Sequence, residues 1–174
     1  MSRAISDLNE SLQETVQWLL LDTEWIDLDL LIYCTYRSPA EQARAYRNGR
    51  AIHQIREKAN ELALKYGRHD LADLLISVGP QFGTEIITHA GPGQSLHQYG
   101  AAFDAVPMRD GKPVWNSRTK DDRELWQRYG DTLERFDLEW SGRWKQFKEM
   151  PHAQQSNADW SALIGDFQWI NGLE

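Results

Sequence analysis

Two side chains with the chemistry of zinc ligands stand seven residues apart in one short stretch of the chain. His97 offers an imidazole nitrogen and Asp104 offers a carboxylate oxygen. The residues between them include Gly100 and Ala102, which are small enough for a tight turn. Such a pair supplies half of a metal site, because zinc is held by three or four protein ligands.

A second pair further along the chain can complete the site. Glu149 and His152 stand three residues apart, with Pro151 between them. Nitrogens from His97 and His152 and an oxygen from Asp104 would hold zinc in three positions. The fourth would stay open for water or substrate, as in catalytic zinc sites. The pattern therefore predicts one zinc ion per chain with these three ligands, and Glu149 as the general base that reaches the water.

Together these residues form the pattern S-x-H-x-x-G-x-A-x-D … E-x-x-H, from Ser95 to His152. With this pattern the chain resembles the zinc peptidases that cut peptidoglycan stem peptides. That family comprises D-Ala-D-Ala dipeptidases and carboxypeptidases and phage L-alanyl-D-glutamate endopeptidases, and the chain looks closest to the phage enzymes. The resemblance runs from about Tyr33 to Gln154 and implies hydrolysis of a stem-peptide bond.

The resemblance also implies roles for residues outside the zinc motif. The segment T-Y-R-S-x-x-x-Q, residues 35–42, has a family counterpart whose arginine reaches into the active site. Arg37 is therefore expected to stabilise the negative charge that develops on the substrate carbonyl. Gln42 is expected to help position the substrate. Ser95 is expected to hydrogen-bond a substrate carboxylate or to stiffen the ligand loop.

The chain departs from the family near the expected substrate groove. Relatives usually have glycine where this chain has Ser141, and they commonly have an aromatic residue where it has Ala153. Some phage members use aspartate at the position of Glu149, so the glutamate is closer to the dipeptidase form. Trp140 and Trp144 could line the groove, although core packing is the more usual role of tryptophan in a domain of this size.

The elements that must position these residues are predicted from apolar periodicity and turn signals. Strands are expected over 27–36, 84–89 and 101–108, and a hairpin turn over 109–112 with Asp110-Gly111 at its tip. Helices are expected over 6–25, 39–48, 51–77 (in two pieces), 119–136 and 156–173, with Ser6 and Ser38 as N-caps. These elements predict an α+β fold, in which helices flank a small, mostly antiparallel sheet that carries the zinc site.

Composition limits the partners and the location. The chain has 174 residues, and we expect one zinc peptidase catalytic domain over 1–174 with no separate cell-wall-binding module. Its net charge of -7 argues against a nucleic-acid partner, which would need a basic surface. No stretch approaches the ~20 apolar residues of a membrane span. The polar N-terminus lacks the apolar core of a secretory signal, so a cytoplasmic location is expected. A monomer is also expected.

The remaining metal-ligating residues are interpreted as structural. Cys34 is the single cysteine and lies in an apolar run, so it is predicted to be a buried small hydrophobic residue. His53 and His69 stand beside charged residues and are expected on solvated faces. His89 is expected to be structural or to support a ligand, because the three-ligand set is complete without it.

The leading functional hypothesis is a phage endolysin that cuts the L-Ala–D-Glu bond and is released from the host cytoplasm at lysis. A cytoplasmic D-Ala-D-Ala dipeptidase or carboxypeptidase is an alternative with the same zinc chemistry. A third hypothesis is a non-catalytic zinc-binding module on the same fold, and the presence of Glu149 argues against it.

Overall fold

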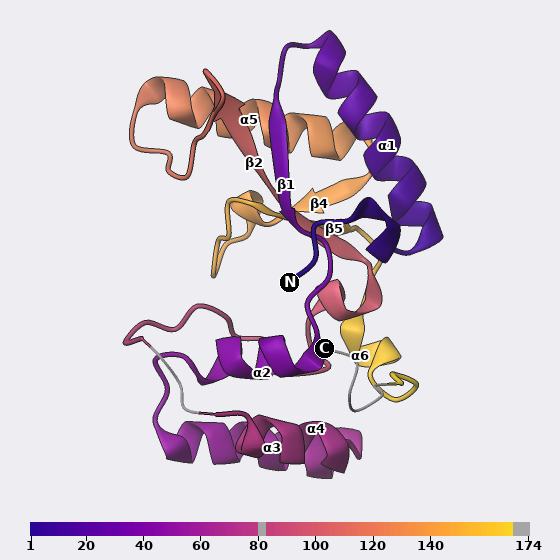
Figure 1. Ribbon diagram of the computed structural model, residues 1–174, viewed down its shortest axis with the longest axis vertical. Helices are drawn as coiled ribbons and strands as arrows, with labels where there is room; N and C mark the ends of the chain where they lie inside the picture. The colour runs from indigo at the N-terminus through magenta and orange to yellow at the C-terminus, as the bar shows by residue number, and fades with distance from the viewer. Residues whose placement is uncertain (80–82, 169–174) are drawn as a thin grey trace. The chain divides into compact units, whose positions relative to one another are not determined.

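The structure, a computed structural model, describes residues 1–79 and 83–168. Helices and an antiparallel sheet make up the fold, which confirms the predicted α+β class (Figure 1). By its internal contacts the chain divides into two compact units, each with its own apolar core. Unit 1 comprises Met1–Tyr36 and Tyr99–Ala158, and unit 2 comprises Arg37–Gln98 with the described residues from Asp159 onward. A single catalytic domain over 1–174 stays a prediction.

Strand β2 (Ala102–Arg109) lies at the centre of the sheet in unit 1. The strand order is β1 (Leu30–Cys34), β2, β5 (His152–Gln155), β4 (Leu138–Trp140), and β3 (Lys112–Pro113) pairs with the end of β2. All these pairings are antiparallel. At the turn into β3, Asp110 and Gly111 have φ angles of 51° and 71°, as an Asp-Gly hairpin tip requires. The predicted strand 101–108 and the hairpin are confirmed.

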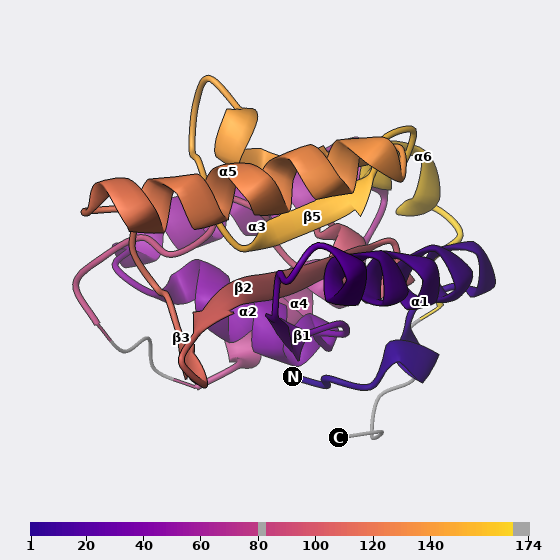
Figure 2. The same ribbon diagram turned by 90° about the horizontal axis from the view of Figure 1, so that it is seen from above.

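Helices α1 (Glu10–Trp25) and α5 (Lys120–Arg135) each bury an apolar stripe in the core of unit 1. The stripe of α5 consists of three residues that are at most 1% exposed: Trp126, Tyr129 and Leu133. These residues share the core with Phe103 of β2, and Figures 1 and 2 show α5 beside the strands. Burial of each such side chain contributes ~1.5–3 kcal/mol. Because side chains alternate along a strand, Asp104 points to the opposite face from Phe103.

Trp140 closes this core at the end of β4. Its indole lies against Gly130 of α5 and Gly142, where a Cβ on either glycine would overlap the ring. Its Nε1 donates to the carbonyl oxygen of Met150 at 2.7 Å. Trp140 is thus a core residue, and it bonds the segment that precedes His152 to the core. The prediction of core packing for most of the tryptophans is wrong, because Trp18, Trp25 and Trp115 are 60%, 90% and 56% exposed.

The N-terminal helix begins later than predicted. Residues Ile5–Asp7 form a separate 3-10 turn, and Asn9, not Ser6, caps α1 by accepting from the backbone nitrogen of Leu12 at 2.9 Å. The cause is tertiary, because the backbone nitrogen of Asn9 donates to the carbonyl oxygen of Gly100 at 2.9 Å. The start of α1 is therefore set by a contact with the turn that leads into β2.

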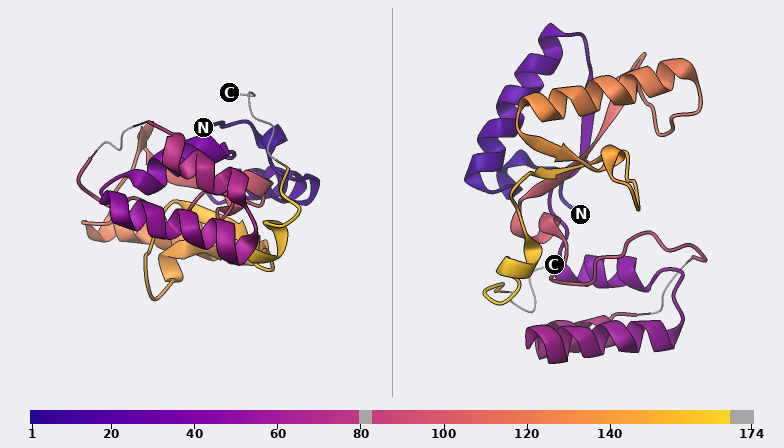
Figure 3. Two further views of the ribbon diagram at one scale, coloured as in Figure 1. Left: turned by 90° about the horizontal axis from the view of Figure 1, so that it is seen from below. Right: turned by 180° about the vertical axis from the view of Figure 1, so that it is seen from behind.

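Unit 2 is built from α2 (Pro39–Arg47), α3 (Ile52–Tyr66) and α4 (His69–Ser77), with the short α6 (Trp160–Leu163). Ser38 caps α2 in a capping box with Glu41, as the sequence predicted for Ser38. Gly67, at a φ of 67°, ends α3 and so divides the predicted helical stretch 51–77 into two pieces. Helices α3 and α4 lie side by side (Figure 3).

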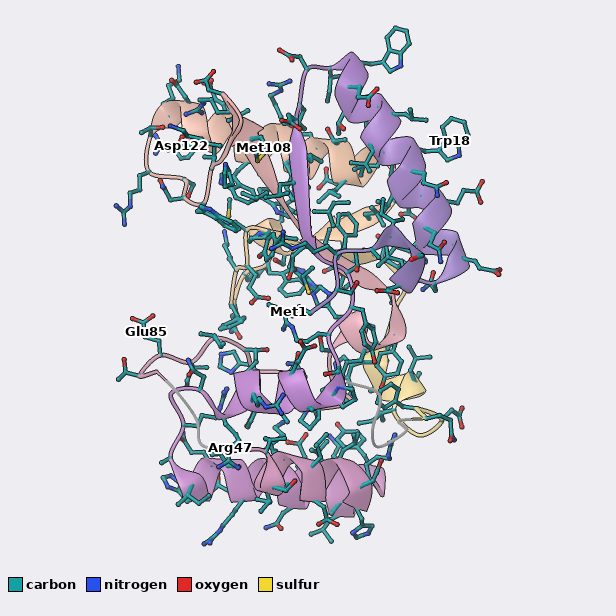
Figure 4. The ribbon with its side chains drawn as sticks, in the orientation of Figure 1. Met1, Trp18, Arg47, Glu85, Met108 and Asp122 are labelled. Atoms are coloured by element: carbon teal, nitrogen blue, oxygen red, sulfur yellow. The ribbon has the colours of Figure 1, made fainter. Side chains whose placement is uncertain are left out.

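Arg47 joins two helices of unit 2. Its guanidinium donates to the carbonyl oxygens of Leu75 and Ile76, both at 2.9 Å, at the C-terminal end of α4. Figure 4 shows this side chain extending from α2 toward that end. A cation is favourable there, because the last carbonyls of a helix carry partial negative charge.

Three predicted elements need correction. Residues 84–89 form no strand: Ile86 and Ile87 are 41% and 51% exposed, and the segment is held to the end of α2 by a side-chain bond from Asn48 to the carbonyl of Glu85. The strand predicted over 27–36 is only Leu30–Cys34, because Asp27 takes a left-handed φ of 52°. The helix predicted over 156–173 is reduced to α6, since Asp159 caps a new start, and its last residues, 169–173, lie outside the described range.

Two short strands, β4 and β5, had no counterpart among the predicted elements. In the described part of the chain, no helix is both long and apolar enough to cross a membrane.

Candidate metal centre

The antiparallel pairing of β2 and β5 places two predicted ligands directly opposite each other. Asp104 is the register partner of His152, and Nδ1 of His152 lies 3.2 Å from Oδ1 of Asp104. The two residues are 6% and 8% exposed. Directly opposed residues share one face of a sheet with their Cβ atoms about 5 Å apart. Sheet formation alone therefore brings these distant residues together.

A chain of hydrogen bonds sets the orientation of the His152 ring. Its Nε2 lies 3.1 Å from Oε1 of Gln154. The amide of Gln154 is oriented in turn, because its Nε2 donates to Glu139 at 2.9 Å and Glu139 also accepts from the indole of Trp144. Only the amide oxygen then faces the ring. The network therefore assigns the ring hydrogen to Nε2 and leaves Nδ1 directed at Asp104.

This arrangement fits a cation. With the hydrogen on Nε2, a neutral His152 ring points a lone pair at the Asp104 carboxylate, and a proton or a metal ion is needed to join them. Burial lowers the pKa of His152, but the Asp104 carboxylate, Gln154 and the charge of Glu149 outweigh it, so this pKa is raised above its usual value. An imidazole nitrogen and a carboxylate oxygen are both ligands that zinc accepts. The residues present therefore fit the implied metal.

His97 lies on the 3-10 helix η2 (Leu96–Tyr99) and is 3% exposed. Gly100 turns the chain from η2 into β2 with a φ of 63°, and a Cβ there would lie 2.6 Å from the nitrogen of Asn9, so only glycine fits. Within unit 1, the buried sulfur of Cys34 lies within 4.8 Å of a carboxylate oxygen of Asp104. His152 contacts the same carboxylate from β5, and the place of His97 as a third zinc ligand stays a prediction.

Cys34 is the residue whose surroundings sequence reasoning missed. It is fully buried, as predicted, but its neighbours include metal-ligating side chains, whereas a purely apolar setting was expected. The apolar residues around Cys34 in the sequence gave no sign of these neighbours. Which residue of β2 lies opposite Cys34 depends on the strand register, which no local signal reveals.

The turn that carries Glu149 and His152 is tied down at two points. The Ser141 hydroxyl and the backbone nitrogen of His152 both donate to the carbonyl oxygen of Glu149. The hydroxyl of Tyr129 donates to the carbonyl oxygen of Pro151 at 3.0 Å. Ser141 thus has a structural partner. The Glu149 carboxylate is close enough to raise the pKa of His152, and its role as general base stays a prediction.

The other predicted site residues lie in unit 2. Arg37 donates from Nη1 to Oε1 of Gln42 at 3.1 Å. Gln42 is fully buried, and its own amide nitrogen donates to the carbonyl oxygen of Ala90 at 2.6 Å. Gln42 therefore positions Arg37, and its contact with substrate stays a prediction. The half-buried Ser95 accepts at its backbone oxygen from the nitrogen of Gln98, which opens η2.

The remaining histidines lie at the surface of unit 2. His53, His69 and His89 are all exposed. For His53 and His69 this agrees with the predicted solvated faces, and the structural or supporting role of His89 stays a prediction.

Comparison with known sequences gives matches over the stretch that carries the predicted zinc motif. Residues 88–155 match the sequence model described as D-alanyl-D-alanine carboxypeptidase. Peptidoglycan L-alanyl-D-glutamate endopeptidase CwlK of Bacillus subtilis is 33% identical over 73 residues, which make up 40% of this chain and 44% of that protein. The chain thus matches less than half the length of this relative.

Two peptidases are among the solved structures that are similar to this chain. The L-Ala D-Glu endopeptidase ChiX of Serratia marcescens is 16% identical, with 87% of this chain and 82% of that chain covered and a TM-score of 0.48. The vancomycin resistance D,D-pentapeptidase VanY, solved with Zn(II), is 15% identical, with 92% and 79% covered and a TM-score of 0.49. The resemblance predicted from the sequence is confirmed: over residues 88–155 the chain is similar to the peptidoglycan-cleaving zinc peptidases.

Proposed function

We propose that the protein is a zinc-dependent peptidase that hydrolyses the L-Ala–D-Glu bond in the stem peptide of peptidoglycan. The observation that carries this proposal is the buried pair of Asp104 and His152, which fits a bound cation, within a segment that matches a peptidase family model. The match to an L-alanyl-D-glutamate endopeptidase supports the choice of bond.

His97, Asp104 and His152 would hold the zinc ion, which when bound activates a water molecule and polarises the peptide carbonyl. Glu149 accepts a proton from the attacking water as the water oxygen bonds to the carbonyl carbon. It then gives that proton to the amine nitrogen as the carbon–nitrogen bond breaks. Arg37, held by Gln42, stabilises the negative charge on the carbonyl oxygen.

A D-Ala-D-Ala carboxypeptidase is the second candidate, and the description of the matching family favours it. The two activities share the zinc ligands and the base, and they differ in which bond the substrate groove accepts. A non-catalytic zinc-binding module is the least supported, because Glu149 lies near His152 on the same tethered turn.

Digestion of purified peptidoglycan, with mass spectrometry of the new termini, tests the proposal. We expect muropeptides that begin with D-Glu, produced by the zinc-loaded protein and not by a matched Glu149→Gln control. Release of free D-Ala would support the carboxypeptidase instead. The absence of any product at full zinc occupancy would favour the binding module.

A role as a phage endolysin is the further part of this proposal. In that role the enzyme accumulates in the host cytoplasm and reaches the wall only at lysis. Expression in the cytoplasm of a Gram-negative host should leave the culture turbid until chloroform permeabilises the inner membrane. The Glu149→Gln variant should not clear the culture after the same treatment. Clearing without chloroform would contradict the role.

A further inference from the structure

One metal-ligating side chain next to the proposed zinc ligands has no part in that mechanism. Cys34 is the last residue of β1 and the single cysteine of the chain. Its thiol makes a weak contact of 4.0 Å with the carbonyl oxygen of Tyr36, and its side chain is fully buried. A buried thiol in an apolar cluster would need no further explanation.

An irregularity in β1 decides what the thiol faces. Along β1 the register pairs Leu31 with Val106 and Ile32 with Ala105, and regular continuation would pair Tyr33 with Asp104. The register shifts at this point, so that Cys34 is the partner of Asp104. An extra residue of this kind is a β-bulge, and bulges re-aim side chains next to functional sites.

The consequence is a row of three side chains across three strands. Cys34 of β1 is opposite Asp104 of β2, and Asp104 is opposite His152 of β5. Directly opposed residues lie on the same face of a sheet. The row therefore offers a sulfur, a carboxylate oxygen and an imidazole nitrogen on one face. The sulfur of Cys34 lies within 4.8 Å of a carboxylate oxygen of Asp104.

We propose that Cys34 is a ligand of the metal centre and supplies a thiolate beside Asp104 and His152. Sulfur, nitrogen and carboxylate oxygen are the three ligand types of zinc. A thiolate here would be a fourth protein ligand, and the water of the proposed function would take a fifth position, which zinc can accept. The thiolate also favours thiophilic ions over hard ions such as Mg²⁺ and Mn²⁺. The inference rests on the proposed function for the identity of the metal site and does not require turnover.

Cobalt substitution tests this ligand directly. Because the chain has one cysteine, any thiolate-to-cobalt charge-transfer band in a one-to-one Co²⁺ complex must come from Cys34. We expect an intense near-ultraviolet band in the unaltered protein. The band should be lost in Cys34→Ala and Cys34→Ser, while the visible cobalt bands remain and circular dichroism shows an unchanged fold. Zinc affinity should fall by more than about tenfold in both variants, since even residues that only support a ligand contribute that much.

The cobalt spectrum of the unaltered protein tests the ligand role of Cys34 without any variant. A stoichiometric cobalt complex that lacks the charge-transfer band overturns the proposal for Cys34. If such a protein still cleaves peptidoglycan, the peptidase function stands and the thiolate ligand is rejected. If the band is present and no stem peptide is cut, the thiolate ligand stands and the peptidase function is rejected.

Discussion

Replacing Gln154 with leucine should weaken zinc binding although Gln154 binds no metal. Its amide oxygen is the partner of Nε2 of His152, and its amide nitrogen donates to Glu139. Leucine has a similar size and offers neither group. The His152 ring then loses the hydrogen bond that directs Nδ1 toward Asp104, while the residue itself remains.

The size of the effect follows from burial. His152 is 8% exposed, so the Nε2 hydrogen of the variant has little access to water. An unsatisfied buried donor costs ~1–3 kcal/mol. A tenfold change in affinity corresponds to about 1.4 kcal/mol, so we expect a zinc affinity about 10- to 100-fold weaker.

Competition with a chromophoric chelator at neutral pH measures this affinity. The matched control is Gln155→Leu, in the next position of β5, where the side chain accepts instead from the amide of Asn9 at 2.9 Å. The control should lose some thermal stability and keep its zinc affinity. Equal zinc affinity in Gln154→Leu and the unaltered protein would refute the role assigned to this network.

Three further predictions concern the proposed chemistry and its support. Glu149→Gln should keep a full complement of zinc by metal analysis while the hydrolysis rate falls by ~10² or more, and loss of the metal would mean that Glu149 is a ligand. Arg37→Ala should lower kcat by about 10²-fold, equivalent to ~3 kcal/mol, because charge on the carbonyl oxygen grows in the transition state; a rise in KM alone would make Arg37 a substrate anchor. Ser141→Ala removes a buried hydroxyl that holds the backbone of Glu149 and should cost ~1 kcal/mol, seen as a Tm about 2–4 °C lower, and an unchanged Tm would show that this bond is not stabilising.

The features that the sequence predicted correctly depend on residues close together in the chain. The Ser38 capping box and the Asp110-Gly111 turn are examples, because the atoms that stabilise them lie within three residues of one another. The division of the 51–77 stretch into two helices could be predicted for the same reason, because Gly67, which ends α3, lies within the stretch itself. The ligand types were also visible, since histidine, aspartate and glutamate carry their chemistry wherever they stand.

Tertiary structure decided the features that depend on distant partners. Asn9 rather than Ser6 caps α1 because the backbone of Asn9 is bonded to Gly100. The short strand β5 exists because it pairs on both sides, and its pairing orients Gln154 toward Glu139. Residues 84–89 have β-branched side chains but no strand partner in the described structure, so propensity alone does not make them a strand.

The candidate site divides in the same way. The sequence by itself determined which residues can bind zinc and move a proton, since that chemistry belongs to single side chains and to the motif they form. Only the folded chain decided that His152 presents Nδ1 and that Cys34 faces Asp104. A register shift of one residue changes the face on which every later side chain lies, and the free energy that selects the register comes from contacts across strands, which no short stretch of sequence contains.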